Sequence, residues 1–275
     1  MSQLRIFSYL PNPRIWKATI AARLCDIEIE LRGSSPKELQ SWLWDFDAHP
    51  LAAGEPATGT EARSGKIGFE GTLHKTASFM QAHPFGTVPA AFSPDGKTGI
   101  FESNSIMRTV ARLGEGRLRL YGRDAYEASR VDSFLDASLV FARDSQIYLL
   151  SLGSEALSTE IHTRTREAFA LYAAGIDRAL AAREFLVGDS LTIADICFVA
   201  ELSLFFNERT RVGELGKLGL EPILRRGIES DFPRAFSHLA KLRGHPAFAP
   251  DVEPYLKKIE TASERMDQLP RTSRD

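Results

Sequence analysis

The chain has 275 residues, enough for one large domain or two modest ones, and its 43% hydrophobic and 25% charged residues are ordinary for a globular protein. A net charge of −2 gives no indication of a nucleic-acid-binding surface, and no apolar stretch approaches the ~20 residues that span a membrane. The start of the chain lacks the pattern of a secretory signal, so we expect a cytoplasmic protein that partners neither nucleic acid nor membrane.

Cysteine and histidine usage gives no indication of a disulfide framework, a metal site or a redox motif. Cys25 and Cys197 are too few for a disulfide framework and lie too far apart for a cysteine metal site. The six histidines show no metal-ligand spacing, so we expect no metal. The C-x-x-C or C-x-x-S pattern of a redox thioredoxin fold is also absent from the start of the first predicted helix.

The first predicted elements alternate between strand and helix. Leu4–Ser8 has a strand composition, and Pro13 suits the first turn of a helix, where its missing N–H would be unpaired anyway. Apolar residues then recur at helical spacing, at Trp16, Ile20 and Leu24. Ile27–Leu31 alternates apolar and acidic residues, which predicts a second strand that Gly33–Ser35 should end.

Residues 36–82 are less regular. Four apolar residues have the spacing of one helical face, namely Leu39, Trp42, Leu43 and Phe46. Residues 54–60 have a loop composition, and Lys75–Ala82 leads into a turn at Pro89. The sequence predicts no clear order of helices and strands over residues 36–74.

A hairpin and a helix are predicted next. Pro89–Phe92 and Thr98–Phe101 have strand character, and Ser93–Gly96 between them is a turn signal. The following helix has one apolar face, formed by Ile106, Val110 and Leu113.

From about Tyr126 the pattern becomes helical. One helix carries an apolar stripe of Val131, Phe134, Leu135, Leu139 and Phe141, and the next one carries Phe169, Tyr172, Ile176 and Leu180. Thr192 and Asp195 form a capping box, with Leu191 placed as a hydrophobic staple, and we expect a structural role for them.

Two short motifs together indicate a recognition site. In Val88-Pro89 the proline favours extended backbone before it, and a cis bond there would expose the Val88 N–H and C=O for pairing with a peptide. In Glu102-Ser103, Ser103 is placed to cap a helix whose free N–H groups attract a carboxylate. The pair suits a small peptide-like ligand with a carboxylate at one end.

These motifs resemble the glutathione site of cytosolic glutathione transferases. The string from Phe185 to Asp195 and His245-Pro246-Ala247-Phe248 also resemble family motifs. The segments Tyr9–Arg14 and Phe101–Ile106 are similar to the transferase-like domain of the elongation factor gamma subunit and its fungal and bacterial relatives. The resemblance runs from Leu4 to about Phe248.

The resemblance implies an α+β fold. An N-terminal thioredoxin-like domain, residues 1–115, would be followed by an all-α C-terminal helical domain, residues 124–260, and a flexible tail, residues 261–275. Residues 36–74 exceed the same region of typical family members, and we interpret them as an insertion. It is either a solvated surface excursion or a part of the active site.

The resemblance also implies glutathione as cosubstrate and a group that stabilises its thiolate. Asn12 falls where the family often places Ser or Cys, and its amide can donate to a thiolate but cannot act as a nucleophile. Arg14 would supply positive charge near the sulfur or near the glycine of glutathione, and Tyr9 and Ser8 are competing donors. As an alternative, Asn12 is an ordinary turn residue before a proline.

Residues at both ends of glutathione follow from the same resemblance. Val88 would pair with the cysteinyl backbone, Glu102 would contact the amine, and Ser103 would hold the γ-glutamyl carboxylate. Asn104 would support that end. The glycine carboxylate has two candidates, Lys75 and His74.

The second substrate is expected to be a hydrophobic small molecule bound between the domains. Its predicted pocket residues are Phe134, Ser138, Phe141 and Phe205, with Arg143, Phe206 and Asn207 as further candidates. Aromatic residues at helical spacing also suit a core, and that alternative stays open.

Two functions are compatible with these features. In the first, the thiolate of glutathione attacks an aromatic electrophile, by conjugation or displacement, with β-aryl ether cleavage as one form of this transferase or lyase chemistry. In the second, the chain is a non-catalytic binding or scaffold subunit that kept the fold. A dimer with an identical or a related chain is expected in either case.

Overall fold

The structure is a computed structural model, and it describes residues 2–52, 60–64, 69, 71–114, 118–154 and 156–267. It divides into two compact units, Met1–Tyr121 and Gly122–Asp275. We refer to them as the N-terminal and the C-terminal unit and describe each by itself.

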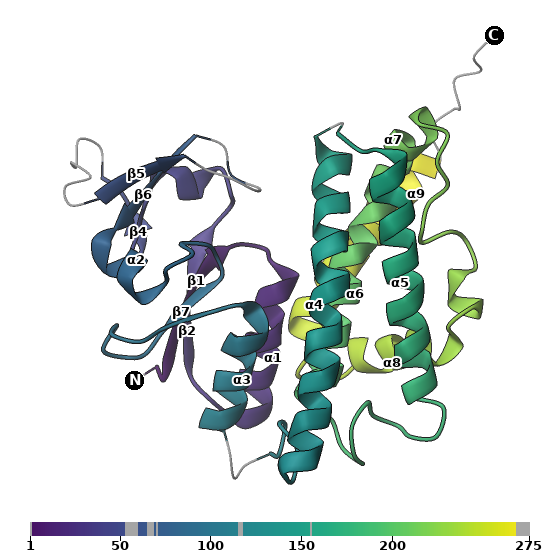
Figure 1. Cartoon of the computed structure of the whole chain (residues 1–275), viewed down its shortest axis with the longest axis horizontal. Helices are drawn as coiled ribbons and strands as arrows, with labels where there is room; N and C mark the ends of the chain where they lie inside the picture. The colour runs from purple at the N-terminus through teal and green to yellow at the C-terminus, as the bar shows by residue number, and fades with distance from the viewer. Residues whose placement is uncertain are drawn as a thin grey trace. The chain divides into compact units, whose positions relative to one another are not determined.

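The N-terminal unit is built on a four-stranded main sheet with the order β2-β1-β7-β8. Strand β1 (Leu4–Tyr9) pairs in parallel with β2 (Ile29–Ser34) and antiparallel with β7 (Ala90–Phe92), which pairs antiparallel with β8 (Gly99–Phe101). Helices α1 (Pro13–Cys25) and α3 (Ser103–Leu113) lie together on one face of this sheet (Figure 1). The predicted thioredoxin-like order is confirmed.

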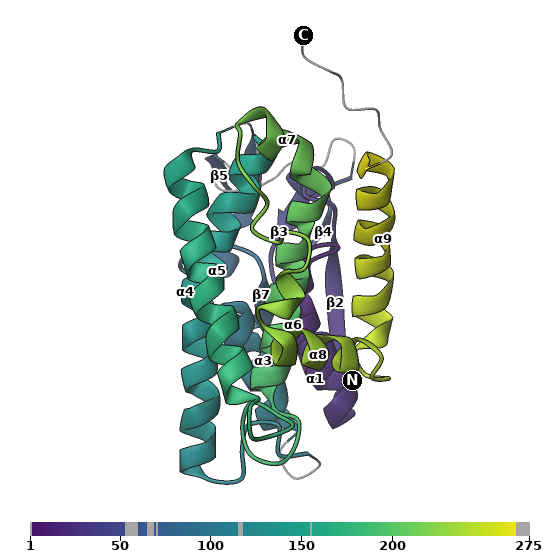
Figure 2. The same cartoon turned by 90° about the vertical axis from the view of Figure 1, so that its right-hand side faces the viewer.

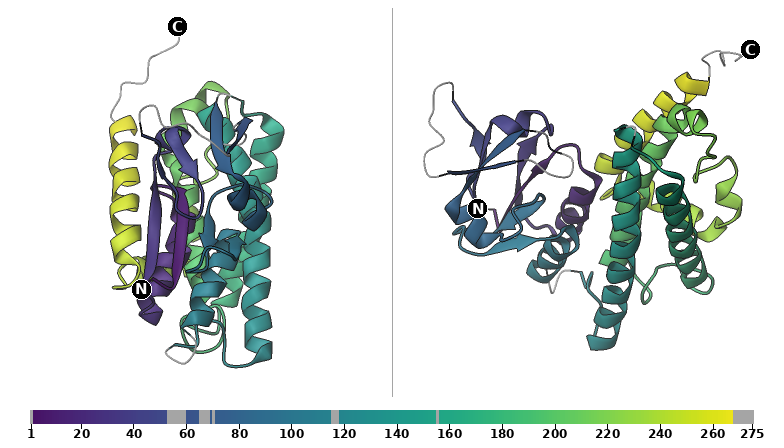
Figure 3. Two further views of the ribbon diagram at one scale, coloured as in Figure 1. Left: turned by 90° about the vertical axis from the view of Figure 1, so that its left-hand side faces the viewer. Right: turned by 45° about the horizontal axis from the view of Figure 1, so that its top comes forward.

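The other face of the main sheet is covered by a second sheet that the sequence did not predict. It has the order β4-β3-β6-β5, with β3 (Trp42–Trp44), β4 (His49–Pro50), β5 (Thr60–Ser64) and β6 (Thr72–Thr76). Helix α2 (Ala77–Ala82) follows directly. We call these strands the insertion sheet, and Figure 3 shows it from two other sides.

The helix predicted over Leu39–Phe46 is therefore wrong. Only Glu38–Ser41 forms a short 3-10 turn, and the chain then enters β3. The spacing of the aromatic residues fits a helix, but Trp44 instead packs into a shared core and donates a hydrogen bond from Nε1 to Leu39 O at 2.9 Å.

Strand alternation explains how one strand serves both faces of the main sheet. Successive side chains of a strand point to opposite faces. On β1, Arg5 and Phe7 meet the insertion sheet, and Phe7 joins a core cluster shared by both sheets. The other members of that cluster are Leu39, Trp44, Ala48, Leu73, Phe79, Ala90 and Phe92.

Strand β2 starts and ends later than the predicted Ile27–Leu31. Ile27 N–H bonds back to Ala22 O and so closes the end of α1. The strand then continues through Gly33, which was expected to break it. A Cβ on Gly33 would lie 1.8 Å from Ser8 O, so only a glycine allows β2 to stay paired with β1 here.

The C-terminal unit is all-helical. It contains α4 (Ala125–Gly153), α5 (Thr159–Ala179), α6 (Ile193–Phe205), α7 (Val212–Lys217), α8 (Pro233–Arg243) and α9 (Ala249–Asp267). Helix α4 packs on α5 and α6 (Figure 2). Nearly every residue of α6 is buried, which makes it the central helix of this unit.

The predicted capping box at the start of α6 is confirmed. Asp195 is fully buried, accepts from the N–H of Leu186 and of Thr192, and also meets His238 Nε2 at 2.9 Å. The predicted tail starts too early, because α9 continues through Asp267 with its apolar residues packed up to Ile259. Residues 268–275 of that tail lie outside the described residues.

Candidate functional site

The loop before β7 forms one half of the site. The Val88–Pro89 peptide bond is cis, and no described residue hydrogen-bonds to the Val88 backbone. Buried His83 anchors the loop, because its Nε2 accepts from Thr87 N at 3.2 Å. Burial lowers the pKa of His83, which favours the neutral ring that this bond requires.

The start of α3 forms the other half. Ala90 pairs with Phe101, so the Val88 loop and Glu102 leave the same end of the β7–β8 pair. Glu102 has a φ of 68°, which few non-glycine residues adopt. Its carboxylate is exposed and has no hydrogen bond or ion pair within the described part of the chain.

Ser103 does not cap α3 as predicted. The non-helical backbone of Glu102 makes Glu102 the N-cap, and Ser103 is the first residue of the helix. Its hydroxyl instead accepts a hydrogen bond from Lys17 Nζ at 3.2 Å, and Asn104 Oδ1 accepts from the same nitrogen at 2.7 Å. Lys17, on α1, is fully buried and is a site residue that the sequence reading missed.

A weak signal for Lys17 does exist in the sequence. It follows Ile15 and Trp16 in the apolar part of α1, where a buried lysine is rarely found unless it is paired. Its partners come from residues 86 and 87 positions away in the chain, which a local pattern cannot reveal.

Asn12 is the N-cap of α1, which agrees with the turn-residue alternative. Its Oδ1 accepts from Arg14 N at 3.0 Å, its Nδ2 donates to Ser8 Oγ at 3.1 Å, and only 1% of it is exposed. The amide has two hydrogens, so one remains after the bond to Ser8. Tyr9 ends β1 and packs edge-on against Phe69, with ring centroids 6.4 Å apart.

The two candidates for the glycine carboxylate both lie on β6 of the insertion sheet. Lys75 is 8% exposed, and its Nζ donates to Gly86 O at 2.7 Å and lies 4.9 Å from the Trp44 ring centroid. His74 is half-buried and pairs with Leu43 across the strands. Lys75 therefore holds the loop that carries Val88.

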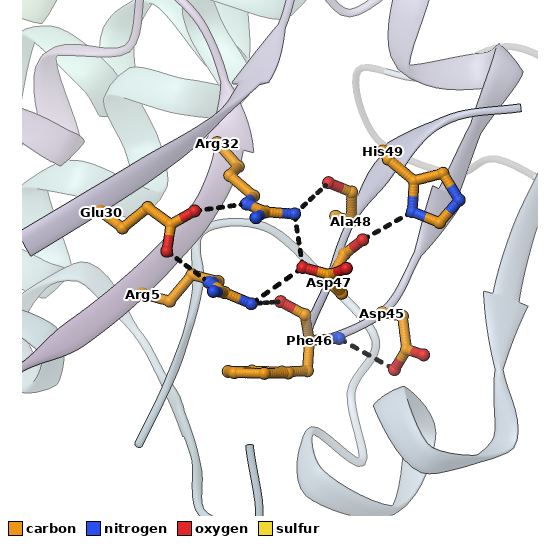
Figure 4. A network of polar contacts seen from close by, with 8 residues as sticks. All are labelled: Arg5, Glu30, Arg32, Asp45, Phe46, Asp47, Ala48 and His49. Atoms are coloured by element: carbon orange, nitrogen blue, oxygen red, sulfur yellow. Dashed lines mark hydrogen bonds and ion pairs between the residues drawn. The ribbon is translucent and has the colours of Figure 1, made fainter. Parts of the chain in front are cut away.

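A network of charged residues fastens the insertion sheet to the main sheet (Figure 4). Arg5 and Arg32 both bind Glu30 at 2.7 Å and both reach Asp47, at 3.0 and 2.6 Å. The hydrogen bond from Arg32 lowers the pKa of Glu30. Arg5 also lies 4.2 Å above the ring centroid of Phe46.

The four predicted electrophile-pocket residues separate into two pairs. Phe134 and Phe141 line a cavity of about 620 Å³ between α4 and α5. Ser138 and Phe205 are fully buried instead, Ser138 against Cys197 Sγ at 3.1 Å and Phe205 stacked on Phe169. Arg143 is exposed and Phe206 is buried, while Asn207 donates to Leu204 O.

Two kinds of feature are absent from the described residues. None of their helices is both long and apolar enough to cross a membrane. No group of three His, Cys, Asp or Glu side chains among them is arranged to hold a metal ion.

No protein-family model matches the chain. Among curated proteins it is 30% identical over 191 residues to the glutathione S-transferase-like protein FUS3 of Gibberella fujikuroi, covering 68% of this chain and 73% of that protein. It is also 27% identical over 185 residues to probable elongation factor 1-gamma 1 of Arabidopsis thaliana. That match covers 65% of this chain, which spans only 39% of the length of the plant protein.

Solved structures share the fold. The glutathione transferase URE2P8 of Phanerochaete chrysosporium superposes with a TM-score of 0.63 at 16% identity, over 94% of this chain and 98% of that one. A glutathione S-transferase of Methylobacterium radiotolerans gives 0.61 at 17% identity, over 91% and 95%. With the shared architecture and the FUS3 match, the chain belongs to the glutathione S-transferase superfamily.

Proposed function

We propose that the protein is a glutathione-dependent transferase or lyase that acts on a hydrophobic, aromatic electrophile. The observation that carries this proposal is the start of α3. There the exposed carboxylate of Glu102 and the hydroxyl of Ser103 stand beside the backbone N–H groups that the first turn of any helix leaves unpaired. This arrangement offers an acceptor for an amine and donors for a carboxylate, the two charged groups of a γ-glutamyl end.

The Val88 loop extends the proposed site along the peptide. Its free backbone N–H and C=O suit antiparallel pairing with the cysteinyl residue of glutathione. Solved structures of similar fold include complexes with glutathione and, for Ure2p5 of Phanerochaete chrysosporium, with 1-(S-glutathionyl)-2,4-dinitrobenzene. These complexes of structurally similar proteins support glutathione as the cosubstrate and an aromatic electrophile as its partner.

In the proposed reaction the bound thiol loses its proton and the thiolate sulfur forms a bond to an electrophilic carbon. A leaving group such as an aryl oxide or halide departs in displacement, whereas an addition retains all atoms. The remaining N–H of Asn12 is our first candidate for donating to the thiolate, Arg14 our second and Tyr9 our third. A donor or positive charge at that point lowers the pKa of the thiol and raises the thiolate fraction.

A second candidate function is a binding or scaffold subunit. The observation that favours it is that Asn12 already caps α1 and bonds Ser8, so its whole role could be structural. The matches to elongation factor 1-gamma proteins point in the same direction.

Turnover separates the two functions. We would measure glutathione-dependent reaction with a chlorinated aromatic, an isothiocyanate and a β-aryl ether, for the parent protein and for Asn12→Ala and Arg14→Ala. The transferase proposal expects turnover by the parent and its loss in at least one variant that still binds glutathione. Binding without turnover on every electrophile would favour the subunit.

We also propose that the chain dimerises, with an identical or a related chain, through the cavity between α4 and α5. Val140 and Leu171 on its lining are 64% and 77% exposed, so the cavity opens onto an apolar stretch of surface, and contiguous apolar surface marks interaction sites. In this proposal Phe134 and Phe141 contribute to the interface rather than to a pocket for the electrophile.

A further inference from the structure

We infer that Lys17 is a positioning residue that turns the Ser103 hydroxyl proton toward the ligand and so sets the specificity for a carboxylate. This inference rests on the proposed glutathione site and assigns a new residue to it. Lys17 lies on α1, is fully buried and meets the candidate site through Ser103 and Asn104 of α3, so it acts through another residue and not on the substrate itself.

The chemistry of the two groups fixes the direction of the hydrogen bond between Lys17 and Ser103. An ammonium group has three donors and no acceptor, so in the contact between Lys17 Nζ and Ser103 Oγ the lysine must donate. The serine oxygen is therefore the acceptor, and its own proton must point elsewhere. No described residue accepts that proton.

Two hydrogen bonds hold the Lys17 ammonium group in a fixed position behind the start of α3. Lys17 is fully buried, and its Nζ also donates to Asn104 Oδ1 at 2.7 Å, next to Ser103 on the same helix. Two bonds to neighbouring residues fix the nitrogen relative to the first turn of α3. A hydroxyl whose lone pair is engaged in this way has its proton restricted to the remaining directions.

The positive charge of Lys17 also acts on the Ser103 hydroxyl. Burial strengthens electrostatic interactions, because fewer water molecules screen them. A buried ammonium directly behind Ser103 therefore polarises the hydroxyl and adds positive potential to the N-terminal end of α3, which already favours anions. A carboxylate at Ser103 gains more from both effects than a neutral acceptor does, and a ligand with no group at this point gains from neither.

The test compares two peptides by titration calorimetry. One is glutathione, and the other is 4-aminobutanoyl-cysteinyl-glycine, which lacks only the α-carboxylate of the γ-glutamyl end. We expect Lys17→Met to weaken glutathione binding about tenfold, the effect of one charge-assisted hydrogen bond. The same variant should leave the affinity for the decarboxylated peptide nearly unchanged.

Two further variants test whether Lys17 acts through Ser103 and through its charge, the first as part of a double-mutant cycle. In a Ser103→Ala background, Lys17→Met should have little additional effect on glutathione, since the group through which it acts is missing. Lys17→Arg should retain most of the preference for glutathione, because it keeps a buried cation that donates. The matched control is Lys97→Met, which removes an exposed lysine of the β7–β8 hairpin and should change neither affinity.

Circular dichroism would establish that each variant is folded, and Lys17→Gln would replace Lys17→Met if the latter is not. Equal losses for both peptides, or independent effects of Lys17 and Ser103, would overturn the inference while the glutathione site stands. Absence of glutathione binding by the parent protein would overturn both.

Discussion

The two ends of the Asn12 side chain have different hydrogen-bond partners. The side-chain oxygen Oδ1 caps α1 by accepting from Arg14 N, and the side-chain nitrogen Nδ2 donates to Ser8 Oγ. Substitutions that keep one end and change the other can therefore separate stability from chemistry.

We predict that Asn12→Asp keeps most of the stability and that Asn12→Ala loses about 1 kcal/mol, because Asp retains the capping oxygen and Ala does not. Urea unfolding monitored by circular dichroism measures both. If the donor role is also right, turnover falls in both variants, since Asp lacks the N–H. Equal stability of Ala and parent would show that the cap contributes nothing.

Single residues also mark the limit of what the sequence could reveal about the site. Glu102-Ser103 was found as a motif, but the capping role of Ser103 was wrong, because Glu102, with its positive φ, is the N-cap and α3 starts one residue earlier, at Ser103 itself. Lys17 was missed because its bonds join residues far apart in the chain. Local patterns indicated the candidate site, and its hydrogen bonds became visible only from tertiary contacts.

Among the elements, the insertion sheet is the part that departs most from expectation. It covers one face of the main sheet and holds the Val88 loop through the bond from Lys75 to Gly86. The strands β1, β7 and β8 and the helices α1 and α3 were predicted, because their periodicities are local. Residues 36–74 carry no comparable local strand pattern in the sequence, and the aromatic spacing around Trp44 fits a helix equally well.

The charged network between the two sheets should make stability depend on pH. The pKa of Glu30 is lowered in the folded state from a reference of 4.5, so its contribution is present above that pH and is lost as the pH falls through the folded value. We predict that Glu30→Gln costs about 0.5–1 kcal/mol at pH 7 and that this difference shrinks as the pH falls below about 4.5.

Unfolding in urea at several pH values would measure this dependence. Urea is preferred to guanidinium chloride because it is uncharged and does not screen the ion pairs. Glu167→Gln, an exposed carboxyl on α5, is the matched control and should show no comparable dependence. A constant difference between parent and Glu30→Gln across the range would show that ionisation of Glu30 is irrelevant to stability.

For the whole molecule, the exposed apolar residues of α4 and α5 predict an assembly. We expect the parent to elute as a dimer and Leu171→Glu to dissociate it, because a charge in an apolar interface loses its hydration without a partner. Light scattering after size-exclusion chromatography measures the mass. Leu218→Glu, which changes a leucine that is 52% exposed elsewhere in the same unit, should remain dimeric. A monomeric parent would contradict the prediction.

The central claim is that this protein binds glutathione and activates its thiol. The most direct measurement is a spectrophotometric pH titration of the thiolate of glutathione bound to the parent protein, with free glutathione and Asn12→Asp alongside. A free thiol titrates near ~8.5, and we predict that the bound thiol of the parent titrates about one unit lower or more. A bound thiol with the pKa of free glutathione would contradict catalysis by thiolate stabilisation and leave the protein as a binding subunit.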